Sequence, residues 1–342
     1  MKLKGHERIL VVKPSSLGDI IHTLPAVSAI HRQYPETQID WLVNTEWLPL
    51  IDGCPVLQKT ISFPRKEFKG LGGLLRAHRW GKRQFESSGY DLALDFQGLL
   101  RSAILAKLSG ARERVGFARA REGASRFYHH PIQVRDWENR HAVDRYRCLV
   151  ESIGVKTEPV EFPLPDGTCV DLPEGFAHSP LVIHPFSRGA GKSLSVAEVE
   201  ELCDALSPLP IVLIGRVEQS LPEDWPGEVL DLLNQTDLGQ LIFLLRRASG
   251  TVSVDSGPMH LAAGISDKVL SLHTWTDPKM VGPWCPDSWV YRDHEFTQVR
   301  DLKAGQFPEH REKKQVLASQ DRLYSSEEIS KIADFIRTHF TP

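Results

Sequence analysis

The stretch RILVVKPSSLGDIIHTLPAVSAIHRQ, residues 8–33, contains a strand, a loop and a helix in immediate succession. Its first part, residues 8–13, is short, apolar and β-branched, as is typical of a buried strand in a parallel sheet. Pro14 ends this strand, and from Ile20 onward apolar residues recur with helical spacing. A strand followed directly by a helix predicts one unit of a parallel sheet with right-handed crossovers.

The same alternation continues along the chain. A strand is expected at 39–43, and another at 91–95 is followed by a helix at 99–108. Residues 158–173 are rich in proline and lack helical periodicity, which predicts a domain linker. A second series follows, with strands predicted at 180–185, 210–215, 250–255 and 268–273 and helices predicted at 196–206, 238–247, 258–264 and 325–340.

Two successive series predict an α/β protein with two doubly wound, Rossmann-like domains facing a cleft. The length of 342 residues also favours two domains over one core. Ligands in such folds bind at the carboxyl ends of strands, so the informative residues are those that directly follow a strand. The polar stretch 301–320 predicts an exposed loop in which Lys313 and Lys314 are solvated.

Composition excludes several classes of protein. A formal net charge of -3 gives no overall attraction to nucleic acid. The 5 cysteines are scattered and form no CxxC, so neither a disulfide framework nor a zinc site is expected. The apolar run near the N-terminus is far shorter than the roughly 20 residues of a membrane span, and no signal-peptide pattern accompanies it. We expect a cytoplasmic protein, with contact at a membrane surface left open.

The loop KPSSLGD, residues 13–19, is neither GxGxxG nor a GxxxxGK[ST] phosphate loop. Asp19 is either part of a helix cap or a general base that takes a proton from an acceptor hydroxyl. Lys13 either binds a phosphate or carboxylate or is a solvated charge at the end of the strand.

Residues 252–264, VSVDSGPMHLAAG, place Pro258 in the first turn of a helix. The free N–H groups of a helix N-terminus favour anions, so a diphosphate fits here without a metal. The alternatives are that Asp255 or Ser256 only caps the helix, and that His260 is a buried, hydrogen-bonded histidine.

Two further loops carry polar groups after strands. Ser187, Arg188 and Lys192 lie within HPFSRGAGK, and together they either clamp a pyrophosphate or form a solvated basic loop. Thr276 and Asp277 either meet a ribose or phosphate or form an Asp-Pro turn.

Basic residues also gather in the N-terminal half of the chain. Arginine recognises phosphate and carboxylate well, so as a set they predict an anionic acceptor, although each alone is a solvated charge. The set comprises Arg65, Lys66, Lys69, Arg101, Arg112, Arg114, Arg119 and Arg121.

Five motifs, in this order, resemble those of the ADP-heptose:lipopolysaccharide heptosyltransferases, glycosyltransferase family 9. They are KPSSLGDIIHTLPA (13–26), DFQGLLRSA (95–103), SRGAGKS (187–193), VSVDSGPMHLAAG (252–264) and HTWTDP (273–278). The first and fourth are the most specific.

This resemblance implies the GT-B fold and an inverting transfer of heptose from ADP-heptose to the Kdo/heptose inner core of lipopolysaccharide, with no metal and no cofactor. It makes Asp19 the general base. The donor-binding residues that it or the loops predict are Ser187, Arg188, Lys192, Glu218, Asp255, Ser256, Gly257, His260, Thr276 and Asp277. The predicted acceptor-binding residues are Lys13, Ser15, Ser16, Gln97, Arg65, Arg101 and Arg119.

The expected organisation is an acceptor domain at 1–165, a nucleotide-sugar domain at 172–325 and a helix at 326–342 that packs back on the N-terminal domain. The expected partners are a nucleotide sugar and an anionic glycolipid, with no nucleic acid and with contact at the cytoplasmic face of the inner membrane left open.

The chain departs from the family pattern in three places. Leu194 and Ser195 stand where the family usually has Trp-Pro. The glycine that the family has before the TDP triplet is replaced near Trp275, and residues 287–320 match no motif. Another nucleotide sugar or acceptor, a nucleotide-sugar epimerase or hydrolase, and a non-catalytic binding relative therefore stay open. A nicotinamide dehydrogenase is disfavoured because no GxGxxG follows either leading strand.

Overall fold

The computed structural model describes residues 2–68, 72–86 and 88–340. Contacts within the chain divide it into two compact units, Met1–Pro165 and Asp166–Pro342. The division falls inside the predicted linker 158–173. Lys69 lies outside the described residues.

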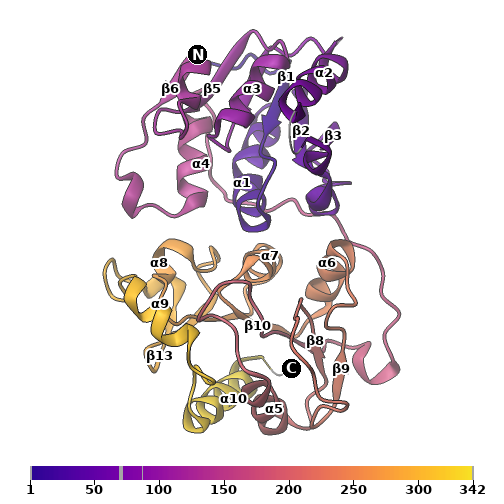
Figure 1. Ribbon diagram of the computed structural model, residues 1–342, viewed down its shortest axis with the longest axis vertical. Coiled ribbons are helices and arrows are strands. Elements are labelled where there is room, and N and C mark those ends of the chain that lie inside the picture. The colour runs from indigo at the N-terminus through magenta and orange to yellow at the C-terminus, as the bar shows by residue number, and fades with distance from the viewer. Residues whose placement is uncertain (1, 69–71, 87, 341–342) are drawn as a thin grey trace. The chain divides into compact units, whose positions relative to one another are not determined.

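The N-terminal domain is a parallel sheet of order β3-β2-β1-β4-β5-β6 with helices around it (Figure 1). Val11 in the central strand pairs in register with Trp41 on one side and Leu94 on the other, and all three are fully buried. The strands are β1 (Arg8–Val12), β2 (Gln38–Asn44), β3 (Lys59–Phe63), β4 (Leu92–Asp95), β5 (Glu113–Phe117) and β6 (His130–Ile132). The α-helices are α1 (Leu17–Gln33), α2 (Gly73–Phe85), α3 (Leu100–Leu108) and α4 (Ala142–Glu151), and α1 and α4 lie side by side.

The C-terminal domain repeats this topology, with the order β13-β12-β11-β10-β7-β8-β9. Every pair is parallel except β12 with β13, which is antiparallel. The strands are β7 (Leu181–His184), β8 (Ile211–Leu213), β9 (Val229–Asp231), β10 (Gly250–Val254), β11 (Val269–Leu272), β12 (Trp289–Arg292) and β13 (Glu295–Gln298). The α-helices are α5 (Val196–Leu206), α6 (Leu238–Arg247), α7 (Gly257–Ile265), α8 (Pro278–Val281), α9 (Arg311–Ala318) and α10 (Ser326–Phe340).

Short 3-10 helices join these elements. They are η1 (Thr45–Leu50), η2 (Arg65–Phe68), η3 (Ala124–Phe127), η4 (Trp137–Asn139), η5 (Glu174–Phe176) and η6 (Val299–Asp301).

The prediction of two doubly wound α/β domains is confirmed. The prediction of an exposed loop at 301–320 is wrong, because this stretch contains η6 in part and the helix α9. Lys313 and Lys314 on α9 both make contacts described below.

The last helix packs within the C-terminal domain, against α5, and its expected packing on the N-terminal domain stays a prediction. Its apolar residues recur at helical spacing and are buried in the same core as residues of α5. These buried residues of α10 are Ile329, Ile332, Ala333, Ile336 and Phe340. The helix is therefore the outer layer of the C-terminal sheet, beside α5 (Figure 1).

Gly250, at the start of β10, gives a test of this packing. A Cβ at Gly250 would lie 2.6 Å from Cγ of Phe340, so we expect Gly250→Ala to destabilise the protein by about 1–3 kcal/mol through overpacking. Gly175→Ala is the matched control, because a Cβ there meets no atom within 4 Å. Thermal unfolding of the full chain measures both. Equal melting temperatures for the two variants would mean that α10 does not pack on β10.

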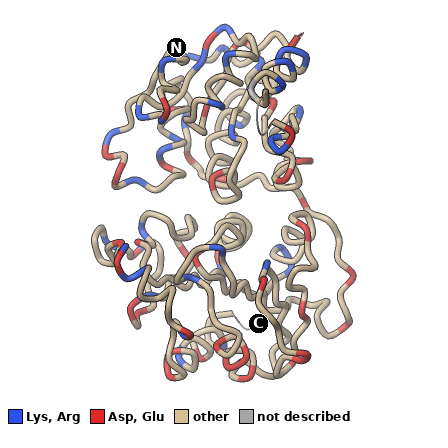
Figure 2. Tube along the Cα trace, in the orientation of Figure 1, with Lys and Arg blue, Asp and Glu red and all other residues tan. Residues whose placement is uncertain are grey.

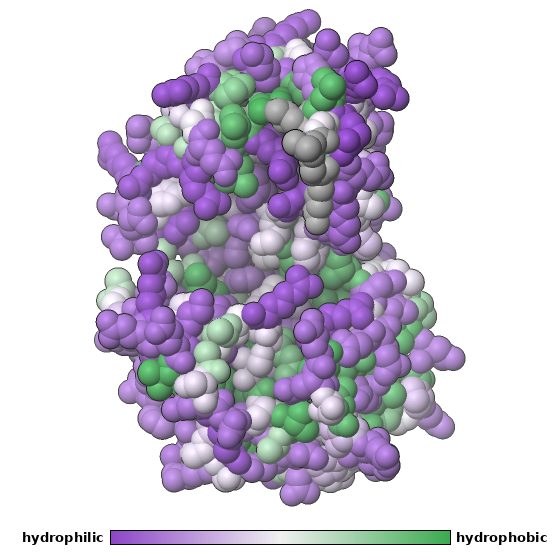
Figure 3. Space-filling view, viewed as in Figure 1, coloured by the Kyte–Doolittle hydropathy of each residue, from purple (hydrophilic) through white to green (hydrophobic). Residues whose placement is uncertain are grey.

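The surface of each domain is mainly hydrophilic on the face shown in Figure 3, with apolar residues in small patches. The apolar residues of the strands are instead buried in the domain cores. None of the helices in the described part of the chain has the length and apolar character needed to cross a bilayer.

Candidate active site

Asp19 lies in the first turn of α1, directly after the loop that follows β1. Its Oδ2 accepts hydrogen bonds from the backbone N–H of Ser16 at 3.3 Å and from the Ser16 hydroxyl at 2.9 Å. Its Oδ1 accepts a hydrogen bond from the Tyr146 hydroxyl at 2.9 Å and lies 3.6 Å from Nζ of Lys13. One carboxylate oxygen thus caps the helix and the other belongs to a polar cluster. The side chain is 40% exposed, so a substrate hydroxyl can reach it.

Lys13 is buried, so the alternative of a solvated strand-end charge is wrong. Its ammonium donates to the Tyr146 hydroxyl at 3.0 Å and to the carbonyl of Phe96 at 3.3 Å. Burial lowers the pKa of Lys13, while the nearby carboxylates of Asp19 and Asp95 raise it.

The pKa of Asp19 lies below its usual value. Burial alone would raise this pKa, but the Lys13 ammonium and the hydrogen bonds from Ser16 and Tyr146 outweigh burial. Asp19 is therefore an ionised carboxylate at neutral pH, in the protonation state that a general base requires.

Tyr146 on α4 was missed by the sequence analysis. Its ring packs edge-on against Phe96, and its hydroxyl joins Lys13 to Asp19. Helical spacing of apolar residues in 143–150 could have predicted a buried face for α4. No pattern in the sequence could have shown that this face meets the loop after β1, more than 100 residues away.

We expect Tyr146→Phe to raise the pKa of Asp19 toward the ordinary value, because the lost hydrogen bond stabilises the charged carboxylate. The titration of the Asp19 carboxyl carbon, followed by NMR, measures this shift. Tyr128→Phe is the control, since the Tyr128 hydroxyl donates to Asp95 instead. A pKa that moves equally in both variants would contradict the assigned role of Tyr146.

The loop after β4 is held by the buried carboxylate of Asp95. This carboxylate accepts hydrogen bonds from the Ser102 hydroxyl, the Tyr128 hydroxyl and the backbone N–H groups of Gln97 and Gly98, at 2.8–3.1 Å. The loop in turn contacts the loop after β1, because Gln97 Oε1 accepts from the N–H of residue 15 at 3.2 Å. The structure thus brings together Gln97 and Ser15, two predicted acceptor-binding residues. Ser16, which was also predicted to bind the acceptor, is exposed beside Asp19.

The basic set of the N-terminal half does not form one site. Arg112 and Arg114 flank the start of β5, whereas Arg119 and Arg121 follow its end, so the sheet separates the two pairs. Arg119 is paired with Glu138 at 2.7 Å, and Arg112 is paired with Asp91 at 3.3 Å. Arg114 donates to two backbone carbonyls. The whole set therefore cannot bind one acceptor group, and the prediction applies to fewer residues.

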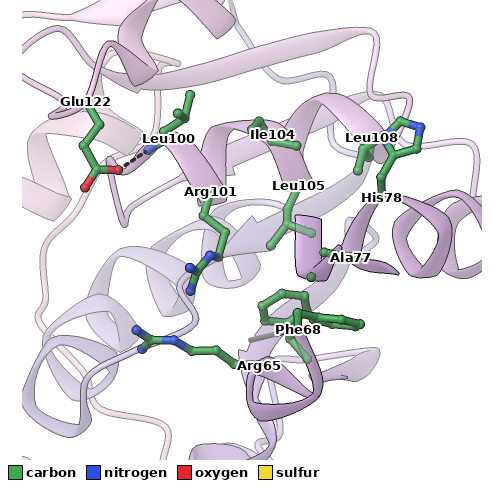
Figure 4. A pocket seen from close by; sticks show the side chains of 12 residues that line it. Arg65, Phe68, Ala77, His78, Leu100, Arg101, Ile104, Leu105, Leu108 and Glu122 are labelled. Atoms are coloured by element: carbon green, nitrogen blue, oxygen red, sulfur yellow. Dashed lines mark hydrogen bonds between the residues drawn. The ribbon is translucent and has the colours of Figure 1, made fainter. Parts of the chain in front are cut away.

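Arg65 and Arg101 remain, and they line one pocket of about 400 Å³ between η2, α2 and α3 (Figure 4). Their guanidinium groups point into the same space, and within the described residues neither has an ion pair or a hydrogen bond. The apolar wall of the pocket consists of Phe63, Phe68, Ala77, Leu100, Ile104, Leu105 and Leu108. Lysines and arginines also cluster along the neighbouring helix α2 (Figure 2).

In the C-terminal domain, the loops after β7, β10 and β11 meet because these strands are parallel neighbours. Lys192 Nζ lies 2.6 Å from Oδ2 of Asp255, and the Thr276 hydroxyl donates to the same oxygen at 2.7 Å. Thr276 also contacts the buried His273 at 3.0 Å. Three predicted donor-binding residues, Lys192, Asp255 and Thr276, thus form one cluster.

The pKa of Asp255 is lowered in this cluster. Burial would raise it, but His273 and Lys192, together with the hydrogen bonds from Lys192 and Thr276, have the larger effect. Burial also lowers the pKa of His273 to about 4, so this imidazole is neutral at neutral pH. The cluster therefore holds one carboxylate and one ammonium.

The N-terminus of α7 begins beside this cluster, at Gly257. No side-chain hydrogen bond caps α7 in the described part of the chain, so neither Asp255 nor Ser256 is a side-chain cap. The Ser256 hydroxyl instead lies 3.1 Å from Nδ1 of His184, a buried residue that the sequence analysis missed as a site residue. Burial lowers the pKa of His184 to about 4, so it too is neutral. His260 lies in the same helix and is half-buried.

The other predicted donor-binding residues lie at the same edge of the sheet but outside the cluster of Lys192, Asp255 and Thr276. The Ser187 hydroxyl accepts from the N–H of Gly189 at 3.2 Å, which shapes the loop after β7. Arg188 and Glu218 are exposed. Asp277 caps α8 by accepting from the N–H of Lys279 at 2.8 Å, so the turn interpretation holds for its side chain. Among the residues that the structure describes, no group of three or more His, Cys, Asp or Glu side chains is placed to hold a metal ion.

Comparisons with known proteins identify the family. Residues 79–307 match the model of glycosyltransferase family 9 (heptosyltransferase). Lipopolysaccharide heptosyltransferase 1 of Pseudomonas aeruginosa is 31% identical over 298 residues, which cover 81% of each chain. Lipopolysaccharide heptosyltransferase 1 of Escherichia coli K12 is 25% identical and covers 83% of this chain and 93% of its own.

Solved structures agree. The E. coli heptosyltransferase WaaC with ADP has a TM-score of 0.73 at 24% identity, and covers 97% of this chain and 99% of its own. A family 9 glycosyltransferase from Veillonella parvula has a TM-score of 0.74 at 19% identity, with 98% of each chain covered. The fold, the motifs and the relatives agree, and the chain belongs to glycosyltransferase family 9, the heptosyltransferase family.

Proposed function

We propose that this glycosyltransferase transfers a heptose from ADP-heptose to a Kdo/heptose acceptor of the lipopolysaccharide inner core, with inversion and without a metal ion. The observation that carries the donor assignment is the cluster of Lys192, Asp255 and Thr276 beside the uncapped N-terminus of α7. Support also comes from relatives named as lipopolysaccharide heptosyltransferases, and from a similar WaaC structure, at 25% identity, with ADP-2-deoxy-2-fluoro heptose.

The donor diphosphate binds the free N–H groups at the start of α7, where the helix dipole favours negative charge. Lys192 turns from Asp255 to the phosphates and neutralises charge on the departing ADP. Asp255, released from this ion pair, accepts hydrogen bonds from hydroxyls of the heptose. These fixed positive groups supply the charge stabilisation that a divalent cation supplies in other transferases.

The reaction is a single displacement. The acceptor oxygen forms a bond to the anomeric carbon while the bond from that carbon to the β-phosphate oxygen breaks on the opposite face, which inverts the configuration. Asp19 takes the proton of the acceptor hydroxyl, and ADP leaves with the electron pair of the broken bond. Tyr146 and Lys13 hold the Asp19 carboxylate in position.

The acceptor binds the N-terminal domain. Arg65 and Arg101 line one pocket and neither guanidinium is ion-paired among the described residues, which suits the carboxylates and phosphates of an inner-core acceptor. Glu122 also lines this pocket, and its carboxylate accepts from the N–H of Leu100 at 3.1 Å. Such an acceptor is anchored in a bilayer, so we propose that the protein works at the cytoplasmic face of the inner membrane. The exposed basic side chains of α2, with the exposed Leu75, suit an anionic surface.

The test is transfer by the purified protein from ADP-heptose to a Kdo-terminated lipid A acceptor in EDTA, read by mass spectrometry. A mass increase of one heptose supports the donor, the acceptor and the lack of a metal requirement together. Product that appears only when Mg²⁺ replaces EDTA would refute metal independence alone.

Failure of transfer is resolved by donor binding. Binding of ADP-heptose without transfer would overturn the acceptor assignment and leave the donor assignment standing. A change in the sugar nucleotide without any acceptor would indicate an epimerase or a hydrolase. Tighter binding of another nucleotide sugar would overturn the ADP-heptose assignment.

A further inference from the structure

The segment 301–320 matches no motif, yet its helix α9 packs on the loop that carries Lys192. A Cβ at Gly191 would lie 3.0 Å from Cβ of Leu317 and 3.2 Å from the carbonyl oxygen of Lys314, both on α9. Leu317 is buried at this contact. The N–H of His310, which precedes α9, donates to the carbonyl of Trp275 at 2.9 Å. The helix is thus fixed beside the predicted donor loop.

Trp275 joins these two parts of the domain. Its Nε1 donates to the carbonyl of Ala190 at 3.1 Å, and the preceding Thr274 donates from its hydroxyl to the carbonyl of Gly191 at 2.6 Å. The indole ring is therefore held against the loop after β7 and has a defined orientation.

Two ammonium groups lie over this one ring. Lys192 Nζ is 4.9 Å from the ring centroid, and Lys314 Nζ is 5.3 Å from it. Both distances are typical of cation–π contacts, in which the negative face of the ring attracts the cation. Lys192 on the loop after β7 and Lys314 on α9 thus contact the same indole ring.

The charges around the ring are unbalanced. Lys192 is paired with Asp255 at 2.6 Å, and Lys313, next to Lys314, is paired with Asp293 at 2.8 Å. Lys314 has no carboxylate partner among the described residues, and it is exposed. Two like charges close to one ring repel each other, and an anion that bound both ammonium groups would offset this repulsion.

We propose that Lys314 is a second phosphate-binding cation of the donor site, and that Trp275 positions its ammonium group together with that of Lys192. The ligand class is a nucleoside diphosphate, whose two phosphate groups offer separate oxygens to the two ammonium groups. This inference rests on the proposed binding of the donor diphosphate by Lys192. It also gives the unmatched segment a role, since α9 supplies one ligand of the phosphates.

The test measures ADP binding by isothermal titration calorimetry with the full chain. We expect Lys314→Ala to weaken ADP binding by roughly fivefold or more, as expected for loss of one charge-assisted hydrogen bond. Lys314→Arg restores most of the affinity. Lys313→Ala is the matched control and leaves the affinity unchanged, because its side chain is paired with Asp293.

Two further readouts separate phosphate binding from a structural role of α9. The ADP affinity of Lys314→Ala should depend less steeply on salt concentration than that of the wild type, because one ion contact is missing. Trp275→Leu should weaken ADP binding, and Trp275→Phe, which keeps an aromatic face, should restore part of it.

The outcomes separate this inference from the donor assignment. If Lys192→Ala weakens ADP binding and Lys314→Ala does not, the role of Lys314 is wrong and the donor site stands. If the wild type binds neither ADP nor ADP-heptose, both the role of Lys314 and the donor assignment are wrong. A loss of affinity in Lys314→Ala that arginine does not restore, with an unchanged salt dependence, would show that α9 acts only as a structural brace.

Discussion

We expect replacement of Asp19, the proposed general base, by Asn to lower kcat for heptose transfer by about 10²–10⁴-fold, the usual contribution of a general base. The amide cannot take the acceptor proton, but its oxygen can still accept from Ser16, so the helix cap survives. The substitution therefore removes the chemistry and keeps the geometry. Binding of ADP stays unchanged, because Asp19 belongs to the N-terminal domain and the donor cluster to the other.

Ser16→Ala is the control for this prediction. It removes only the 2.9 Å hydrogen bond from the Ser16 hydroxyl to Asp19, so a much smaller loss of kcat is expected. Both variants are assayed at saturating donor with the acceptor on which the wild type is active. Near-normal turnover by Asp19→Asn would show that another group takes the proton.

Arg292→Met destabilises the C-terminal domain by about 3–5 kcal/mol, which lowers Tm by roughly 10 °C. Arg292 lies in β12 and is fully buried, and its guanidinium donates to the carbonyls of Thr276, Phe307 and Pro308. Methionine fills similar space but leaves these three buried acceptors without donors. The loss is large because the three carbonyls come from two separate segments that this one side chain joins.

Arg292→Lys separates charge from geometry. A single ammonium cannot reproduce the planar fork that reaches three carbonyls, so an intermediate loss of stability is expected. Lys313→Ala removes an ion pair at the surface of the same region and should change the stability by less than about 1 kcal/mol. Differential scanning calorimetry measures all three. A Tm of Arg292→Met within 2–3 °C of the wild type would mean that water replaces the guanidinium at little cost.

Elements with strong local signals could be predicted from the sequence. The helices predicted at 196–206 and 238–247 have the same bounds in the structure, where each begins with a capping box. In both, the side chain at the cap and the side chain three residues later hydrogen-bond each other's backbone. The strand β1 was clear for a different reason, since its apolar β-branched run ends at a proline.

Contacts between distant segments could not be predicted in this way. The two oxygens of Asp19 show the difference, because Ser16 is three residues away and Tyr146 is 127 residues away. The same holds for α10, whose apolar stripe was visible in the sequence although its partner α5 was not. Periodicity predicts that a face is buried, and only the topology decides what covers it.

The basic set of the N-terminal half failed for a related reason. Arg112 and Arg121 are close in the sequence, but one precedes β5 and the other follows it, so they lie at opposite ends of a strand. Arg65 and Arg101 are far apart in the sequence and line the same pocket. Counting charges along a chain groups residues by position, whereas an anion meets only those that share one edge of the sheet.

The indole of Trp275 is also a chromophore whose emission responds to charges placed over its ring. Because the ammonium groups of Lys192 and Lys314 both lie over this ring, an anion that binds them changes the local electric field at the excited state. Under the proposed nucleotide binding, the emission of Trp275 is expected to report nucleotide occupancy. A variant in which the other tryptophans are replaced by phenylalanine would allow binding to be followed in real time, without label or coupled assay.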